Sequence, residues 1–266
     1  MRHSQLTIFA ILLAWLLLAA SPQPMRAQCP TKNTAFKAGE RLNYDLYFQW
    51  NFVWIKCGSA HYSIKEHTYS GKKALRNDLL FKTSKKMDMF FVMRDTLVSY
   101  ITPDLVPLYY RKGATEGKRY TVNEVWYTYP EGKTKLRQRY LNRHGEESYR
   151  DHVTTECLYD MLSILSRARS FETSGMKVGE RIHFSMATGY AVKQEILVYK
   201  GKERWKANDK KTYDCLVFSL LDDEDPEKKK EMLRFYVTDD ARHMPVRIDF
   251  HLKFGTAKAY FKEGTL

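Results

Sequence analysis

The chain of 266 residues carries 44 Lys and Arg against 31 Asp and Glu, which gives a formal net charge of +13, and it contains four cysteines. Its length is enough to bury a core of ordinary size, so the chain does not need the disulfide support of small secreted scaffolds. The basic balance predicts attraction to anionic surfaces such as lipid head groups or acidic polysaccharides, although a charge that only keeps a β-rich protein soluble fits equally well.

The N-terminus predicts a secretory signal peptide over residues 1–27. A short basic start precedes the apolar run Leu6–Ala20, and the small residue Ala27 precedes the expected cleavage point. Lipidation at Cys29 is the less favoured alternative. Residues 28–266 contain no further apolar run of the roughly twenty residues that a spanning helix needs, so we expect no transmembrane segment in the mature chain. Export also makes nucleic acid a poor candidate partner.

All four cysteines lie in the mature chain, at Cys29, Cys57, Cys157 and Cys215. In an oxidising compartment an even number of cysteines predicts two disulfides, and three pairings are possible. Pairing Cys29 with Cys57 and Cys157 with Cys215 would keep each bridge within one half of the chain, and we favour it. Buried free thiols are the alternative.

Most of the mature chain reads as strands, and two of its segments resemble each other. KAGER at Lys37–Arg41 and KVGER at Lys177–Arg181 each precede a run of aromatic and β-branched residues. The segment YITPDLVPLYY, from Tyr100, likewise corresponds to YVTDDARHMPVRIDF, from Tyr236. The matches share an offset of about 140 residues, which predicts a duplicated β-meander and not a solenoid, whose periods are roughly 20 to 50.

One long helix, Thr154–Phe171, is predicted between the two halves. Its apolar residues recur at the three-and-four spacing of one helical stripe, and a threonine at its start can cap the first turn. The stripe consists of Leu158, Met161, Leu162, Leu165 and Ala168.

The fold class predicted from these elements is mainly β. We expect residues 28–266 to form a single β-rich domain of two similar halves, about 37–150 and 177–262, joined by helix 154–171. The duplicated antiparallel β-meander would form a curved sheet, a sandwich or a partly open barrel packed around that helix.

A hairpin of the first half carries the candidate binding residues. Its strands, Tyr120–Tyr129 and Thr134–Asn142, flank the turn Pro130–Lys133. Strand alternation places basic side chains on one face, beside aromatic rings of the opposing strand, and such a row can hold phosphate or carboxylate groups while a ring packs on a sugar or an acyl chain. The alternative is a half-solvated edge whose charges deter aggregation. The candidate binding residues are Arg119, Tyr127, Lys135, Arg137 and Arg139.

A second aromatic hairpin lies near the start of the mature chain. Phe48, Trp50, Phe52 and Trp54 alternate strictly, so they are expected to share one face. That face would be either core or the lining of a hydrophobic cavity, and core is the favoured interpretation.

No motif predicts a metal site or a cofactor. The histidines lack ligand spacing, and the chain has neither a Cys-x-x-Cys pair nor an HExxH motif. The acidic turn Asp222–Glu227 lacks the Gly and terminal Glu of a calcium loop, so we expect a solvated hairpin tip. A Gly-x-Ser-x-Gly elbow is also missing. A carboxylate pair for glycan hydrolysis would be Glu203 with Asp239 or Asp240, which is weak evidence among 31 acids.

A series of short motifs resembles the exported bacterial domain-of-unknown-function 3108 family. The resemblance covers roughly Gly39–Phe261 and implies a β-rich envelope protein of a Gram-negative bacterium, in the periplasm or the outer cell envelope, with no catalytic residue to transfer. The motifs are Ala38-Gly39-Glu40, Gly58-Ser59-Ala60, Asp95-Thr96 with Pro107, Tyr159–Ser163, Gly201-Lys202-Glu203, and Asp240-Ala241-Arg242 with Pro245-Val246 and Gly255.

Three functions follow as hypotheses. The leading one is non-enzymatic binding of an amphipathic or anionic envelope molecule, which would be a lipid, a glycolipid or an acidic glycan. The first alternative is a glycan-acting hydrolase that uses a carboxylate pair. The second is a structural or partner-binding envelope protein, for which an exposed, unpaired edge strand is the discriminating feature.

Overall fold

The computed structural model describes residues 29–222, 231–252 and 255–266. The predicted signal peptide, residues 1–27, therefore lies outside the described residues, as does the acidic turn after its first residue. None of the helices in the described part of the chain has the length and apolar character that crossing a bilayer would require.

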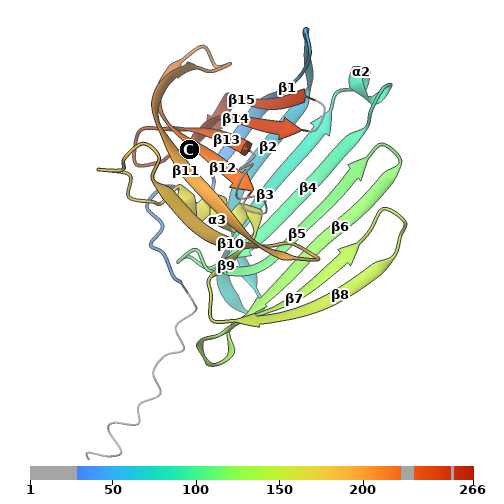
Figure 1. The fold of residues 1–266 in the computed structure, drawn as a ribbon, viewed down its shortest axis with the longest axis vertical. Coiled ribbons are helices and arrows are strands. Elements are labelled where there is room, and N and C mark those ends of the chain that lie inside the picture. Colours follow the sequence, from blue (N-terminus) through green and yellow to red (C-terminus); the bar gives the residue numbers. More distant parts are fainter. Residues whose placement is uncertain (1–28, 223–230, 253–254) are drawn as a thin grey trace, which may run out of the picture.

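All strands of the described residues belong to one antiparallel sheet that curves around a helix, with a single short parallel pair at its edge (Figure 1). The strands of the first half are β1 (Arg41–Trp50), β2 (Val53–Tyr69), β3 (Lys72–Thr83), β4 (Met93–Ile101), β5 (Pro107–Glu116), β6 (Arg119–Thr128), β7 (Thr134–Leu141) and β8 (Glu147–Thr154). Those of the second half are β9 (Leu158–Tyr159), β10 (Arg181–Ala187), β11 (Val192–Lys206), β12 (Thr212–Asp222), β13 (Glu231–Thr238), β14 (Pro245–Leu252) and β15 (Gly255–Thr265). The α-helices are α2 (Lys85–Asp88) and α3 (Met161–Ala168), and a short 3-10 helix, η1, spans Pro130–Gly132.

Neighbouring strands pair in chain order within each half, and β1 pairs with β15 to join the halves. The sheet therefore has β8 and β9 as its two edges and stays open between them. It curls far enough that the turn between β10 and β11 meets the first half, where the Gln138 side chain donates hydrogen bonds to the carbonyls of Thr188 (2.6 Å) and Ala191 (3.1 Å). The predicted mainly β fold is confirmed, as one open curved sheet.

Strand alternation explains which face became the interior. Along β4, buried residues alternate with half-exposed ones, so that Asp95, Leu97, Ser99 and Ile101 point to the inside. The interior core includes fully buried Leu42 and Ile64 of the first half, and it continues into the second half.

The two halves share backbone geometry where their sequences resemble each other. The Gly39 amide donates to the Ile64 carbonyl (2.9 Å), and the Gly179 amide donates to the Tyr199 carbonyl (2.8 Å). Both glycines have positive φ, +103° and +91°, a conformation that side chains with a Cβ rarely adopt. The carbonyl after each glycine accepts a hydrogen bond in return: Glu40 from the Ile64 amide and Glu180 from the Tyr199 amide, each at 3.0 Å.

The predicted helix Thr154–Phe171 is wrong in its first part, because α3 begins only at Met161. Thr154 ends β8, and β9 pairs in parallel with β10. The cap is Asp160, whose Oδ1 accepts hydrogen bonds from the amides of Leu162 (2.9 Å) and Ser163 (3.0 Å). The Ser163 hydroxyl accepts one in return from the Asp160 amide, which completes a capping box that the threonines could not supply.

The favoured disulfide pairing is also wrong. Cys29 is bonded to Cys157, with 6.0 Å between their Cα atoms, and Cys57 and Cys215 are free thiols. The bridge ties the segment before β1 to the connection between β8 and β9, so it does not stay within one half. Burial raises the pKa of both free thiols, that of Cys215 to about 11, as expected for cysteines that behave as small apolar side chains.

Aromatic side chains on the outer face cross the junction between the halves. Tyr260 on β15 lies between Tyr47 on β1 (5.3 Å between ring centroids) and Trp205 on β11 (5.2 Å). The Arg247 guanidinium lies 4.3 Å from the Trp205 ring and 4.4 Å from the Tyr236 ring. Cation–π and ring contacts of this kind add stability to a sheet that has no second layer outside it.

Candidate functional site

A cavity of about 410 Å³ lies between the inner face of the sheet and α3. Both halves of the chain contribute its walls, which are mainly aliphatic and aromatic. The phenylalanines that line it are Phe81, Phe171, Phe184, Phe218, Phe235 and Phe250. Its volume falls within the roughly 300 to 1,000 Å³ of small-molecule sites, and its apolar walls are typical of them.

The apolar stripe of α3 forms one wall of this cavity. Met161, Leu162, Leu165 and Ala168 all line it, whereas Leu158, the fifth member of the predicted stripe, lies in β9. The helix packs against β4 on one side and against β9 and β10 on the other. The stripe therefore lines the cavity, and its fully buried member Leu162 also packs in the core with residues of the sheet.

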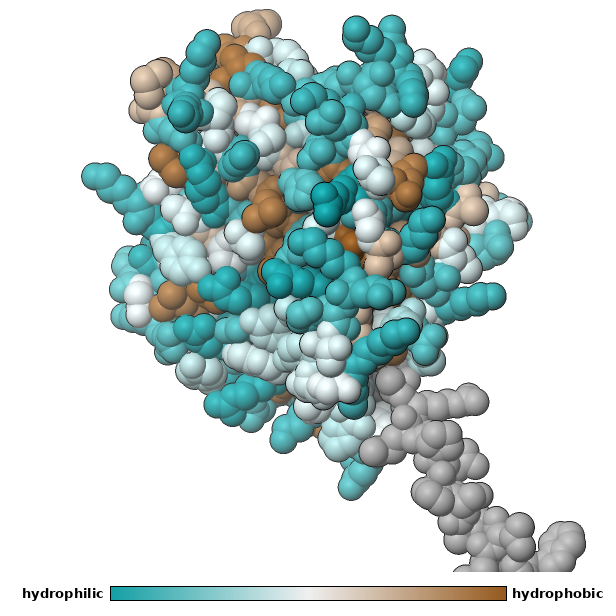
Figure 2. Space-filling model, turned by 180° about the vertical axis from the view of Figure 1, so that it is seen from behind, coloured by the Kyte–Doolittle hydropathy of each residue, from teal (hydrophilic) through white to brown (hydrophobic). Residues whose placement is uncertain are grey.

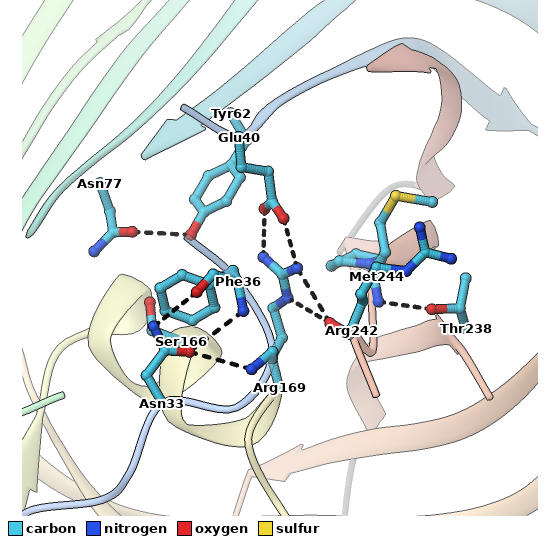
Figure 3. Close-up of polar contacts among 12 residues, drawn as sticks. Asn33, Phe36, Glu40, Tyr62, Asn77, Ser166, Arg169, Thr238, Arg242 and Met244 are labelled. Carbon is cyan, nitrogen blue, oxygen red and sulfur yellow. Dashed lines mark hydrogen bonds and ion pairs between the residues drawn. The ribbon is translucent and has the colours of Figure 1, made fainter. Parts of the chain in front are cut away.

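A buried ion pair lies at the end of α3, where Arg169 also lines the cavity (Figure 3). The Arg169 guanidinium donates to both carboxylate oxygens of Glu40, at 2.6 and 2.9 Å, and these side chains are only 1% and 2% exposed. The same guanidinium donates to the Arg242 carbonyl at 3.1 and 3.2 Å, and His243 Nδ1 lies 2.7 Å from the Arg169 carbonyl. These contacts fix the helix end to the start of β1 and to the turn before β14.

A charged group lines the cavity near the start of β4 and the end of β5. Asp95 on β4 and Lys112 and Glu116 on β5 all point inward, with 3.5 Å between Asp95 Oδ2 and Lys112 Nζ. Asp95 is buried, and its Oδ1 has no hydrogen-bond partner among the described residues. Burial raises the pKa of Asp95, Lys112 opposes that rise, and Glu116 adds to it. These three side chains can therefore contact the polar head group of an amphipathic molecule whose apolar tail lies along the rest of the cavity.

The predicted basic row lies on the outer face of β7, away from the cavity. Lys135 and Arg137 are exposed and alternate with the buried Leu136 and Gln138. Arg139 is neutralised by two carboxylates, Glu124 (2.9 Å) and Glu147 (2.5 Å), and Arg137 lies 3.8 Å from the Asp151 carboxylate. The alternation was predicted correctly, and whether the row binds an anion stays a prediction.

The other two predicted binding residues lie apart from this row. Tyr127 is opposite Leu136 in the register of β6 and β7, so it points inward and is only 5% exposed. Its hydroxyl has no hydrogen-bond partner among the described residues, and burial raises its pKa far above the usual range. Arg119 is exposed at the start of β6, opposite Glu116. Trp126, not Tyr127, shares the outer face with Arg137.

The carboxylates nominated for hydrolysis do not line the cavity. Glu203 is exposed on β11. Asp239 forms an ion pair with Lys202 (2.6 Å). Burial raises the pKa of Asp240, but hydrogen bonds from Arg242 and Thr238 outweigh it and hold the pKa below its usual range. The described residues also contain no cluster of His, Cys, Asp or Glu side chains suited to a metal ion.

Strand β8 is an edge of the sheet, and most of its side chains are exposed. Its sequence, ESYRDHVT, places charges of both signs along this edge. Charged edges discourage the addition of a further strand, so β8 offers weak support for a partner-binding role.

The cavity residues were not among the binding residues predicted from the sequence. The signal that could have found them was the stripe of α3, because four of its five members line the cavity. A second signal was the Asp95-Thr96 motif, whose acidic residue lies on the buried face of β4 beside Leu97.

Comparisons with known proteins agree with this fold. The family described as "Protein of unknown function (DUF3108)" matches residues 43–262, which confirms the resemblance seen in the sequence. A β-barrel-like protein of the domain of unknown function DUF1849 from Brucella abortus is similar in structure, with a TM-score of 0.57 and 10% sequence identity over 85% of this chain and 96% of that one. A protein from Bacteroides fragilis, described as exported and as having a YmcC-like fold, aligns over 90% of this chain and 100% of its own, with a TM-score of 0.35 and 7% identity. No curated protein matches the sequence.

Proposed function

The chain belongs to the DUF3108 family of proteins of unknown function, and we propose that it binds one amphipathic lipid in its interior cavity without catalysing a reaction on it. The observation that supports this proposal is the cavity itself, about 410 Å³ in volume, with apolar walls from both halves of the sheet and from α3. Among the predicted ligands, a lipid fits these walls better than an acidic glycan, because an apolar wall leaves buried hydroxyl groups without hydrogen-bond partners.

The lining suggests how the ligand would lie. A hydrocarbon tail would run along Leu165 and the phenylalanines, where each buried CH₂ contributes about 0.8 kcal/mol. The head group would lie at Asp95, Lys112 and Glu116. A ligand N–H or O–H there could donate to the unpartnered Oδ1 of Asp95, and a phosphate or carboxylate could accept from Lys112.

The proposed place of action is the envelope of a Gram-negative bacterium, in the periplasm or at the outer envelope. The signal-peptide pattern of residues 1–27 supports export. The disulfide between Cys29 and Cys157 is the kind of bond that persists in an oxidising compartment.

Native mass spectrometry of protein purified without detergent from its own envelope tests the proposal. We expect a stoichiometric adduct of lipid mass in the unchanged protein. Leu165→Trp fills the cavity from the α3 wall and should abolish the adduct. Val178→Trp is the matched control, because Val178 is 72% exposed and is not a cavity residue, so the adduct should persist.

Two outcomes would overturn the proposal. One is an adduct with unchanged occupancy in Leu165→Trp, because a bound lipid would then lie elsewhere. The other is a clean apoprotein mass for the unchanged protein together with no binding of a fluorescent long-chain fatty acid. Thermal unfolding of both variants checks that a lost adduct does not come from a lost fold.

A further inference from the structure

Exposed apolar side chains gather at one end of the sheet. Six of them form what we call the apolar rim, and they belong to the β1–β2 turn, the connection from β3 to β4 that contains α2, and the end of β14. Phe52 is fully exposed, Phe90 is 82% exposed and Met89 is 77% exposed. Figure 2 shows apolar side chains projecting at the upper edge of the molecule, where Figure 1 places α2 and the tip between β1 and β2. The members of the apolar rim are Phe52, Val53, Met89, Phe90, Phe91 and Leu252.

The topology explains why these three segments lie at the same end of the sheet. Antiparallel neighbours place every second turn at the same end of the sheet, and β1 lies between β2 and β15, with Gln49 opposite Thr256. The connection from β3 to β4 is held to the next turn of this end, because the Gly117 amide donates to the Val92 carbonyl at 2.7 Å. The three segments of the rim therefore lie at the same end of the sheet.

Basic side chains surround the apolar rim. Those without an ion pair to any described residue are Lys82, Lys85, Lys86, Lys118 and Arg119, all exposed. The acid within α2, Asp88, is already paired with Arg94. Exposed aromatic and aliphatic groups among unpaired cations have the composition of surfaces that enter the headgroup region of a bilayer.

We propose that the apolar rim docks on the surface of an anionic lipid bilayer. The aromatic and methionine side chains would enter the interface, and the five cations would lie at the level of the acidic head groups. Charge decides against a second copy of this chain as the occupant, because pairing two such rims would bring ten unpaired cations together.

The rim lies beside the proposed ligand cavity. Leu252 belongs to the rim and also lines the cavity. Two further cavity residues lie at this end of the sheet: Met93, the first residue of β4, and Glu116, the last residue of β5. A lipid leaving the cavity at this end would enter the bilayer without crossing bulk water. The docking itself rests on the exposed residues alone and holds whether or not the cavity binds lipid.

Vesicle flotation tests the docking. Protein lacking residues 1–27 is mixed with phosphatidylcholine vesicles, with or without phosphatidylglycerol, at low and high salt. We expect flotation with the anionic vesicles and a sharp decrease at high salt. The double variant Phe52→Ser/Phe90→Ser should reduce the bound fraction at least tenfold. Lys85→Ala/Lys86→Ala removes two of the five cations, so it should bind less and with a weaker salt dependence than the unchanged protein. Val178→Ser, at the opposite end of the sheet, should bind like the unchanged protein.

Other results would contradict the docking. The rim is not a membrane surface if the unchanged protein does not float with anionic vesicles. The same conclusion follows if Phe52→Ser/Phe90→Ser floats with them as well as the unchanged protein. Self-association that disappears in the same variant would show that the rim contacts a second copy, which also overturns the proposal. Leu165→Trp separates the two proposals, since it should lose the bound lipid but keep vesicle binding.

Discussion

Both carboxylate oxygens of Glu40 accept hydrogen bonds from the guanidinium of Arg169, although the two residues are 129 positions apart in the chain. Glu40 lies in the KAGER segment that leads into β1, and Arg169 ends α3. Because this pair holds the helix inside the curved sheet, it fixes the wall that α3 contributes to the cavity.

The first prediction concerns this pair. Glu40→Gln removes the negative charge and leaves the Arg169 guanidinium buried without its counterion, so we expect the free energy of unfolding to fall by about 3 to 5 kcal/mol. Urea unfolding, followed by circular dichroism, measures the change. Replacing both residues, as Glu40→Gln with Arg169→Met, should recover a large part of that loss.

The internal repeat supplies the control for this prediction. Glu180 occupies the corresponding position of KVGER, but it is exposed, and its Oε2 accepts only from the Lys177 amide (3.0 Å). Glu180→Gln should therefore change stability by no more than about 0.5 kcal/mol. Equal losses of unfolding free energy in Glu40→Gln and Glu180→Gln would show that the stabilisation by Glu40 does not come from its buried ion pair.

Local patterns of the sequence were sufficient for some of the strands and turns, but not for β9, which lay inside the predicted helix. The hairpin around Pro130–Lys133 was predicted within a residue or two, because a turn signal between two alternating runs depends only on neighbours in the chain. The start of α3 was not predicted correctly, because Thr154, Thr155 and Asp160 are all good capping residues. The choice of Asp160 depends on the pairing of β9 with β10 and on the bond of Cys157 to Cys29, which are long-range contacts.

The cavity could not be predicted for the same reason. Phe81 and Phe250 lie 6.2 Å apart between ring centroids, yet they come from different halves of the chain. Their contact depends on the pairing of β1 with β15 and on the curvature of the whole sheet. Tyr127 shows how fine the dependence is, because a shift of one residue in strand register moves a side chain from the outer face to the inner one.

The second prediction concerns the outer face. Arg247→Ala removes three cation–π contacts and leaves the buried Asp249 without the hydrogen bond from Arg247 Nε (2.8 Å). We expect a loss of about 2 to 4 kcal/mol in the free energy of unfolding. Arg204→Ala is the matched control: Arg204 and its partner Asp214 are 78% and 73% exposed, so their ion pair should contribute no more than about 1 kcal/mol. A loss at Arg247 as small as that at Arg204 would contradict the role assigned to the aromatic contacts.

The third prediction uses the free thiols as reporters. Cys57 lines the cavity, whereas Cys215 is fully buried and lies outside it. A small thiol reagent should react with Cys57 slowly, because burial raises the pKa of its thiol, and faster as the pH increases. A bound long-chain fatty acid should slow this reaction several-fold. Cys57→Ser should abolish the reaction itself. If the fatty acid binds but leaves the rate unchanged, the ligand lies outside the cavity.

The fourth prediction is a pH dependence that comes from Asp160. Burial raises the pKa of this carboxyl to about 6, against the opposing hydrogen bonds from Ser163, Ser99 and Leu162. The folded state therefore binds the Asp160 proton more tightly than the unfolded state, whose pKa is about 3.9. The resulting stabilisation is fully present below about pH 4 and is lost as the pH increases through about 6.

Asp160→Asn tests this dependence, because asparagine still caps a helix but does not titrate. We expect the unfolding free energy of the unchanged protein, minus that of the variant, to decrease by about 2 to 3 kcal/mol between pH 4 and pH 7. Groups that titrate equally in both proteins cancel in this difference. A difference that stays constant over the range, or increases with pH, would show that the carboxyl is charged at the helix cap throughout.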